Sequence, residues 1–465
     1  MIAAVARVSA PIALAVLVAC VWLNQGVGRD DWDAYRDRVS AAPREHVLDF
    51  VRAPFAYLYK QASDIQLYYE VAGMILGRPT DAAFVSDARG ALPSRFVHDP
   101  PPADGRWHAP YEEVFLEYPA AALPFILAPR LVTTSPPEYG LVFGAVMGLF
   151  LVGAVIAALG AANTADVDEA GLRKRAWLAS GLLLAQGAIA VQRLDATTAL
   201  WLMLAVYAAV RRKPIAFGAW AGLATASKFV PALMLPAIMA ADASFWRSSR
   251  PLSRFAAGFG VAFAAGIVPM FVFSGHALAD VIAYHSARGL DCESTLGFLL
   301  AVWRLVTGTR LPSTIAFGSY NLHGPGAGAL AAASEPLSIA ALAGLAWVFW
   351  RDGQRDQRSG ERGPERVACA AFAALVLLWL TGKAFSTQYM TWGIPLVLAI
   401  PGRVGVKLAW LLVGAMGLTQ LYVCGHHELV VQGRPLGLLN LGARQALLAA
   451  AGYLAARNVR GLSKC

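Results

Sequence analysis

Long apolar stretches, separated by short polar segments, recur along the whole chain. A helix needs roughly 20 residues to cross a bilayer, with a range near 17–25, so the pattern predicts about 11–13 crossings, several of them short or tilted. The stretches lie at residues 8–23, 115–133, 139–161, 176–192, 195–210, 214–243, 255–273, 336–350, 367–381, 389–401, 408–424 and 436–456. We therefore expect an all-α protein, a polytopic transmembrane helical bundle that forms one integral membrane domain over residues 1–465.

The stretch at residues 214–243 is longer than a single crossing requires. Lys228 and Pro231 interrupt it near its middle. A charged side chain is costly in lipid, and proline removes a backbone donor from a helix. The interruption favours a hairpin of two short helices with Lys228 between them.

The composition agrees with a membrane protein. Hydrophobic residues make up 57% of the chain and charged residues 15%, against roughly 45–50% and about 25% in soluble proteins, and the mean hydropathy is +0.51. So much apolar surface cannot be hidden in one aqueous core. The net charge of +9 requires no nucleic-acid partner, because most of the surplus Arg and Lys falls in short loops, where it sets orientation in the membrane.

The basic segments predict which loops face the cytoplasm, because Lys and Arg are retained on that side. We assign four of them to the cytoplasm, at residues 211–213, 246–254, 351–366 and 457–464, of which 351–366 alone carries five arginines. The extracytoplasmic loops are then 25–112, 274–293, 309–326, 383–388 and 425–435. One conflict remains: either residues 115–133 fail to cross or the basic residues 173–175 face outward.

The first outer loop contains a helical pattern at residues 63–79, SDIQLYYEVAGMILGRP. Its apolar residues recur at helical spacing, which predicts an amphipathic helix on the outer leaflet that ends at Gly77-Arg78-Pro79. Two roles fit Asp64 at its start. Periodicity alone favours a helix cap, and the alternative is a catalytic base.

Two further candidates lie where apolar stretches begin or break. Glu117 and Tyr118 stand at the mouth of the second stretch, where a headgroup anchor is as good an interpretation as a site residue. Lys228 can extend its side chain to the interface, or it can present a cation to a lipid phosphate. Its position at a break favours the functional role slightly.

The segment at residues 284–294, YHSARGLDCES, gathers His285, Arg288 and Glu293 within one short loop. Arginine offers a planar donor fork suited to phosphate, and histidine can move protons near neutral pH. A solvated loop has a similar composition. The setting between apolar stretches favours function here.

The segment at residues 383–395, KAFSTQYMTWGIP, opens another outer loop. Lys383 is a further candidate for phosphate binding, while Gln388 and Tyr389 offer neutral hydrogen-bonding groups for sugar hydroxyls. Arg444 lies inside the last apolar stretch, and the sequence suggests no specific partner for it. Polar residues from loops far apart in sequence thus share one predicted side of the membrane, which suggests a common site.

Motifs for soluble nucleotide-driven chemistry are missing from the sequence. It contains no Walker loop, dinucleotide fingerprint, HExxH or GxSxG. The histidines of GHHE at residues 425–428 are weak candidates for metal binding. We expect no metal and no other cofactor.

The order of these segments resembles the GT-C superfamily of polytopic glycosyltransferases, and within it glycosyltransferase family 87, which includes mycobacterial polyprenol-phosphate-mannose-dependent mannosyltransferases. The resemblance runs from about residue 55 to about residue 400, through SDIQLYYEVAGMILGRP, EYP at 117–119, GLATASKFVPALMLP at 222–236, YHSARGLDCES and KAFSTQYMTWGIP. Each motif is short and degenerate. Ala120 replaces the family's usual second proline, and VQRLDAT at 191–197 replaces a common Gly-Gln-x-Asn-like turn.

The resemblance implies inverting transfer of a hexose, mannose by preference, from a polyprenyl-phosphate donor to an acceptor hydroxyl on a glycolipid, glycan or protein. Asp64 then matches the family's general base. Lys228, Arg288 and Lys383 would bind the donor phosphate, with Tyr68, Glu117, Tyr118, His285, Glu293, Gln388 and Tyr389 binding substrate or supporting the site. The enzyme would lie in the inner membrane of a bacterium, with the site facing outward.

A lipid or polysaccharide transporter, or flippase, is the alternative. Transporters often show paired repeats with matching broken helices. This chain shows one such break, near Lys228, without a convincing second copy. A non-catalytic membrane scaffold is a third class, and it would not require Arg, His, Lys and carboxylates to converge from separate loops. We therefore favour an enzyme.

Overall fold

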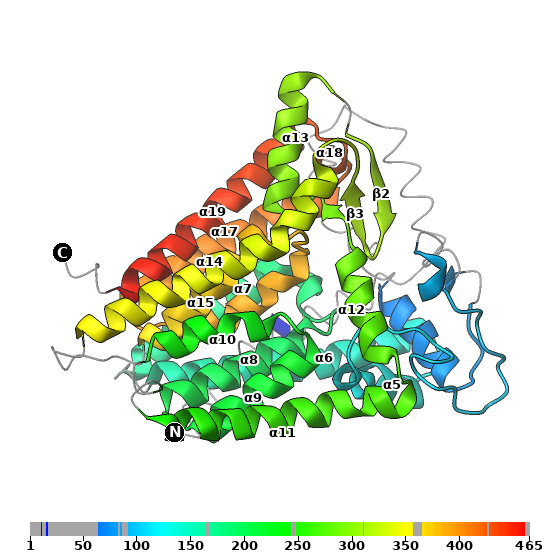
Figure 1. Ribbon diagram of the computed structural model, residues 1–465, viewed down its shortest axis with the longest axis horizontal. Coiled ribbons are helices and arrows are strands. Elements are labelled where there is room, and N and C mark those ends of the chain that lie inside the picture. Colours follow the sequence, from blue (N-terminus) through cyan, green and yellow to red (C-terminus); the bar gives the residue numbers. More distant parts are fainter. Residues whose placement is uncertain are drawn as a thin grey trace.

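The computed structural model describes residues 11, 15–16, 64–81, 84–85, 92–163, 168–242, 245, 248–309, 311–356, 365–425 and 427–460. The described part is largely helical, as predicted, and residues 64–75 form its first helix of several turns (Figure 1). The longer helices after it are α5 (Leu123–Val132), α6 (Pro136–Asn163), α7 (Glu169–Gln186), α8 (Asp195–Val210), α9 (Pro214–Ser227), α10 (Pro231–Ala240), α11 (Ser249–Phe273), α12 (Ala277–Ala287), α13 (Thr295–Thr307), α14 (Ala327–Asp356), α15 (Glu365–Thr381), α17 (Gly402–Gly425) and α19 (Pro435–Val459).

Four of these helices are long and apolar enough to cross a membrane: α6, α11, residues Ala327–Gln354 of α14 and residues Gly402–Leu421 of α17. Several others, such as α8 and α10, are apolar but shorter. The expected total of crossings stays a prediction. The first expected crossing, residues 8–23, lies almost entirely outside the described residues.

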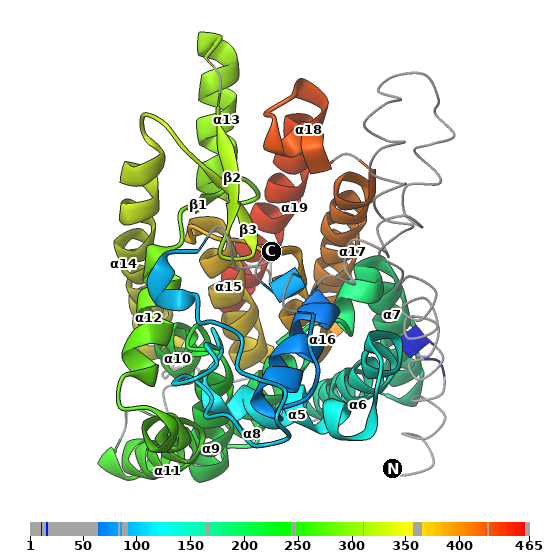
Figure 2. The same ribbon diagram turned by 90° about the vertical axis from the view of Figure 1, so that its right-hand side faces the viewer.

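The helices alternate in direction between two ends of the bundle. Asp195 opens α8 and Lys228 follows α9, and their side chains lie 2.8 Å apart, so the two helices run antiparallel. The turn at residues 211–213 therefore lies at the opposite end. We call that end the basic end. It also holds the ion pair between Asp352 of α14 and Arg460, which follows α19. The end at Lys228 is the loop end, which Figure 2 turns toward the viewer.

The stretch predicted as a hairpin is two helices, α9 and α10, with Lys228 in the break between them. Glycines let α9 lie against α11 at very close range, because a Cβ on Gly218 or Gly258 would collide with backbone atoms of the other helix. Gly218 faces Phe255 and Gly222 faces Phe259, so α9 and α11 run parallel. α10 returns to the basic end, where its Ala240 lies beside Gly353 of α14.

Hydrogen bonds near the two ends of residues 115–133 bear on whether this segment crosses. Tyr118 is hydrogen-bonded to Tyr68 at 3.0 Å, and Thr134 accepts a hydrogen bond from Tyr69 at 2.6 Å. The intervening segment, which contains η2 (Ala120–Ala122) and α5, thus begins and ends beside adjacent residues of the helix at 64–75. The segment therefore returns to the end of the bundle from which it starts, which favours the alternative that residues 115–133 fail to cross.

The course of the chain after this segment places the basic residues 173–175 with the other basic segments. α6 leaves the loop end and α7 returns to it, so α7 starts at the basic end. There Arg175 donates to the carbonyl oxygens of Leu398 and Ile400, at 2.9 and 2.6 Å. These residues end α16 (Gly393–Ala399), which is far shorter than the crossing expected at 389–401. A cation at a helix C-terminus is favourable, because the last carbonyl groups carry partial negative charge.

A small antiparallel sheet at the loop end was not predicted. Its strands are β1 (Leu290–Asp291), β2 (Ser313–Ala316) and β3 (Ser319–Leu322), in the order β1-β3-β2. The β2–β3 turn has positive φ at Phe317 and Gly318, as in the tight turns that match strand twist. The helix α13 is a second unpredicted element, and the fold is therefore helical with one minor sheet.

The helix at residues 64–75 is more deeply buried than an amphipathic surface helix. Its predicted apolar residues are buried, but so is Glu70, at 3% exposure, whose carboxylate accepts from the Asp81 N–H at 2.9 Å. Gly77 has a positive φ of 61°, which ends the helix where the sequence predicted. The helix exists as expected, but its position on the outer leaflet with one polar face exposed is not observed.

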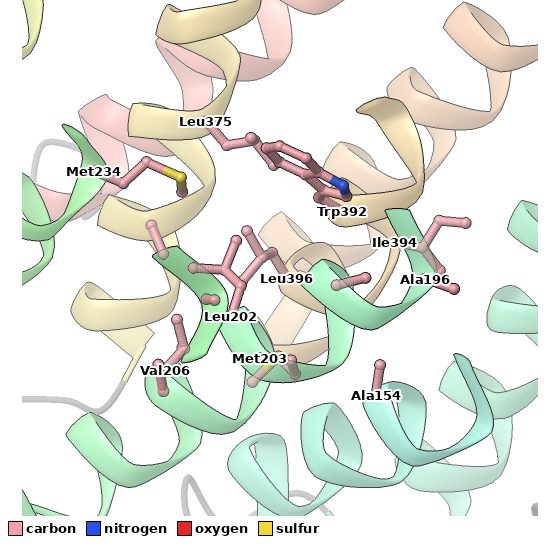
Figure 3. Close-up of a cluster of buried hydrophobic side chains, with 14 of the residues drawn as sticks. Ala154, Ala196, Leu202, Met203, Val206, Met234, Leu375, Trp392, Ile394 and Leu396 are labelled. Carbon is pink, nitrogen blue, oxygen red and sulfur yellow. The ribbon is translucent and has the colours of Figure 1, made fainter. Parts of the chain in front are cut away.

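Figure 3 shows the apolar core beneath the loop end. Leu202 of α8 lies beside Leu396 of α16, and Ile394 of α16 lies near Ala196 of α8, with Met234 of α10 and Leu375 of α15 above them. Trp392, from η5 (Thr387–Trp392), closes the top of this cluster and is 1% exposed. The core therefore supports η5, the segment that carries Gln388 and Tyr389.

Candidate functional site

Asp64 lies at the loop end, where its carboxylate forms an ion pair with the guanidinium of Arg193. The side chain of Asp64 is 34% exposed and that of Arg193 is 11% exposed. Within the part of the chain that the structure describes, this carboxylate thus pairs with an arginine that is far away in the sequence. The carboxylate is held in place and still open to an incoming molecule.

Arg193 comes from a tight, buried turn between η3 (Gly187–Ala190) and α8. From residue 188 to residue 199, every residue except Arg193 is buried. Thr197 fixes the turn, because both its N–H and its hydroxyl donate to the Leu194 carbonyl oxygen, at 3.0 and 2.7 Å. The rigid turn aims one long side chain at Asp64.

Asp195, two residues later, is 2% exposed and pairs with Lys228. Sequence reasoning missed both Arg193 and Asp195 as site residues. The available signal was their charge: QRLD separates two apolar stretches, where charged residues are costly and often functional.

Lys228 occupies the break between α9 and α10. Its Nζ donates to Asp195 at 2.8 Å and lies over two aromatic rings, 4.2 Å from the centre of Tyr389 and 5.0 Å from that of Trp392. Aromatic faces attract cations. The break therefore delivers a cation into a site that the 383–395 segment also lines.

Arg288 reaches the same group from another segment. It donates to the Ser319 hydroxyl at 3.2 Å and to the Tyr389 hydroxyl. Its Nε is buried and has no hydrogen-bond partner among the described residues. Arg288 is thus held by neutral hydroxyls, with donor capacity left for an anion.

His285 lies among the three predicted phosphate-binding cations. Its Nε2 is 3.1 Å from the Glu117 carbonyl oxygen. Burial, with smaller contributions from the charges of Arg288, Lys228 and Lys383, lowers the pKa of His285 to about 4. A pKa this low favours the neutral form of His285 near pH 7, and its role in the site stays a prediction.

Lys383 donates to the Ser286 carbonyl oxygen at 2.9 Å and to the Glu335 carboxylate at 2.7 Å. Its backbone carbonyl accepts from the N–H of Asp291 at 2.9 Å. The Asp291 carboxylate in turn accepts from the N–H groups of Glu293 and Phe385, at 3.1 and 3.3 Å. Asp291 thus joins the loop after α12 to the segment that begins at Lys383.

Burial, then the nearby charge of Glu293, raises the pKa of Asp291 to about 7. The residue is 2% exposed. Because Asp291 is buried and hydrogen-bonded to backbone groups, we interpret it as a structural residue that connects the loop after α12 to the segment beginning at Lys383.

Glu293 and Arg444 form a separate pair. Their side chains lie 3.6 Å apart, with Arg444 0% and Glu293 13% exposed. Gln445 also donates to the Glu293 carbonyl oxygen, at 3.1 Å. Arg444 thus has the partner that the sequence did not suggest, and Glu293 ties the loop after α12 to α19.

Tyr68 and Tyr118 face each other at the other side of the site. Their hydroxyls are 3.0 Å apart. The nearby charges of Glu117 and Asp195 add to the effect of burial in raising the pKa of both phenols. Burial raises the pKa of Tyr118 well above its usual value, so the group stays protonated. Gln388, beside Tyr389 in η5, is half-buried.

The predicted residues thus come together at one end of the bundle. Asp64 connects through Arg193 and Asp195 to Lys228, and both Lys228 and Arg288 contact Tyr389. Lys383 donates to the carbonyl oxygen of Ser286, the residue after His285. Within the described ranges, no three His, Cys, Asp or Glu residues are placed to hold a metal ion, and the side chains of GHHE at 425–428 lie outside them. The absence of a metal from the reaction stays a prediction.

Comparisons of the chain with models of known protein families, with curated proteins and with solved structures found no match.

Proposed function

We propose that the chain is a membrane glycosyltransferase that moves a hexose, mannose by family resemblance, from a polyprenyl-phosphate donor to an acceptor hydroxyl. One observation carries this proposal. An accessible carboxylate, Asp64, pairs with Arg193, and two residues further along the same turn Asp195 pairs with Lys228, at one end of a bundle with membrane-length helices. A lipid-linked phosphate sugar needs a base on one side and cations on the other.

Asp64 is the carboxylate best suited to act as the base. The acceptor hydroxyl must approach within hydrogen-bonding distance of the base. The Asp64 side chain is 34% exposed, whereas Asp195 is 2% exposed and already holds Lys228. Asp64 can therefore take the acceptor proton as the hydroxyl attacks the anomeric carbon from the face opposite the phosphate, which inverts its configuration.

Arg288 is the cation most available to the donor phosphate. Lys228 pairs with Asp195 and Lys383 with Glu335, while the hydrogen bonds of Arg288 go to hydroxyls. Its fork can hold two phosphate oxygens. The phosphate leaves as an anion without needing a proton, so the site requires cations and no second carboxylic acid.

The proposed orientation puts the loop end outside the cytoplasm. Basic segments at residues 173–175, 211–213 and 457–460 share the opposite end of the bundle, and positive loops are retained in the cytoplasm. The donor and acceptor would then meet at the outer face of the membrane.

The test is transfer of label from radiolabelled polyprenyl-phosphate mannose, and from other polyprenyl-phosphate hexoses, to lipid, glycan and protein acceptors in membranes that contain the chain. Labelled product is expected with at least one donor. Glu112→Gln, which changes a 53% exposed carboxylate at the same end, should behave as wild type. Absence of labelled product with every donor would contradict the proposal and favour the transporter alternative.

A further inference from the structure

The turn at residues 193–195 lies between the two halves of the site. Arg193 pairs with Asp64 on one side, and Asp195 pairs with Lys228 on the other. The two residues point to opposite partners from a turn whose neighbours are buried. A small part of the chain therefore sets the position of both a carboxylate and a cation.

We propose that Arg193 is the positioning residue for Asp64, an inference that rests on the proposed function. The guanidinium holds one carboxylate oxygen and thereby directs the other toward the acceptor. Arg193 Nη1 contacts Asp64 Oδ2; within the described residues Oδ1 has no such contact, and it is the oxygen that would receive the proton. Arg193 itself touches neither donor nor acceptor in this role.

The placement of the two side chains supports this assignment over donor binding. The Arg193 side chain is 11% exposed and that of Asp64 is 34% exposed, so the carboxylate is the more accessible of the two to an incoming molecule. Arg288, with a buried Nε that has no hydrogen-bond partner within the described residues, is the better phosphate ligand. Arg193 is also rigid, because Thr197 and the buried residues around it fix the turn.

An arginine in this position affects the chemical step and leaves donor binding alone. A misplacement of about 1 Å at a reacting group costs on the order of 10²-fold in rate. Loss of Arg193 should therefore lower kcat. A lysine keeps the charge while losing the fork, so it should restore part of the rate.

The experiment measures kcat and the donor KM, with labelled polyprenyl-phosphate sugar, for wild type, Arg193→Gln, Arg193→Lys, Asp64→Asn and the double variant Asp64→Asn with Arg193→Gln. The matched control is Arg106→Gln, because Arg106 is 62% exposed and pairs with Asp104 and Glu113. Elution of each variant as a single folded species in detergent establishes that the fold is intact.

For Arg193→Gln we expect kcat to fall by about 10²-fold with the donor KM within about threefold of wild type, and Arg193→Lys to recover at least about a tenth of the lost rate. The double variant should be no slower than Asp64→Asn alone, because residues that act through one another are not additive. A raised donor KM with unchanged kcat, or losses that add in the double variant, would overturn the inference. If wild type itself transfers no sugar, the proposed function fails first, and the inference falls with it.

Discussion

The two ends of the bundle both carry cations, but they treat them differently. At the basic end, Arg211, Arg212 and Lys213 are exposed, and the Arg460–Asp352 pair leaves the arginine 45% exposed. At the loop end, Lys228 and Lys383 are 15% and 12% exposed, and each has a carboxylate partner. Exposed charges suffice to orient a protein in a membrane, whereas partly buried and partnered charges are costly to maintain and indicate a site.

The largest expected effect comes from breaking a buried ion pair at the loop end. Lys228→Met leaves Asp195, at 2% exposure, without its cation, and removing one partner of a buried ion pair costs about 3–5 kcal/mol. Unfolding in detergent followed by fluorescence should show this loss. Lys213→Met, at the basic end, should unfold as wild type does. Equal stability of the two variants would remove the contrast between the ends.

The next effect is on donor binding. Lys383→Gln removes a cation whose carboxylate partner Glu335 is 59% exposed, so stability should change little. A hydrogen bond from a charged group contributes about 1.5–3 kcal/mol, and its loss should raise the donor KM by roughly 10-fold or more in the transfer assay. A donor KM that stays at the wild-type value would exclude Lys383 from phosphate binding.

A pH dependence follows from His285. Its pKa is lowered by burial to about 4 from an ordinary value of 6.5, so the unfolded chain binds a proton in this window and the folded chain does not. The free energy of unfolding is therefore unaffected by this group above pH 6.5, and it decreases as the pH falls from 6.5 toward 4. At pH 5 the loss should be on the order of 1–2 kcal/mol.

His285→Asn should remove this part of the acid sensitivity, while donor transfer at pH 7 should change less than in Lys383→Gln. The measurement is the melting temperature in detergent at pH 7.5 and pH 5 (assay conditions chosen on either side of the ordinary histidine value, roughly 6.5). A wild-type melting temperature that is the same at both values would show that His285 is not buried as described.

The smallest effect concerns the basic end. Arg460→Gln breaks a pair at 2.9 Å, but exposed ion pairs contribute about 0–1 kcal/mol. We expect a change near the lower limit of detection by thermal unfolding, and no change in transfer. A loss comparable to that of Lys228→Met would show that the two ends do not differ in the way proposed.

Local chemistry made part of this arrangement predictable. The helix at 64–75 and its end at Gly77 follow from apolar spacing and a left-handed glycine, and the break at Lys228 follows from a charge and a proline in an apolar stretch. The sequence also predicts Lys228, Arg288 and Lys383 as candidate phosphate-binding residues, because cations are unusual beside membrane segments. These features depend on a few neighbouring residues, which the sequence contains.

The remainder depends on contacts between segments far apart. Hydropathy shows that residues 115–133 are apolar, but only the hydrogen bonds of Tyr118 and Thr134 to one helix show that the segment begins and ends at the same place. Arg193 and Asp195 become candidate site residues only once their partners Asp64 and Lys228, on other segments, are known. Arg444 is similar, because its partner Glu293 lies in a distant loop. Pairings of this kind leave no periodic signal in sequence.

The most direct test of the central claim separates donor binding from transfer in Asp64→Asn. The substitution keeps the shape of the side chain and removes its ability to take a proton, so the account predicts that the variant binds polyprenyl-phosphate sugar as wild type does and transfers it about 10²–10⁴ times more slowly. Glu112→Gln should match wild type in both measurements. Transfer at the wild-type rate by Asp64→Asn would contradict the account.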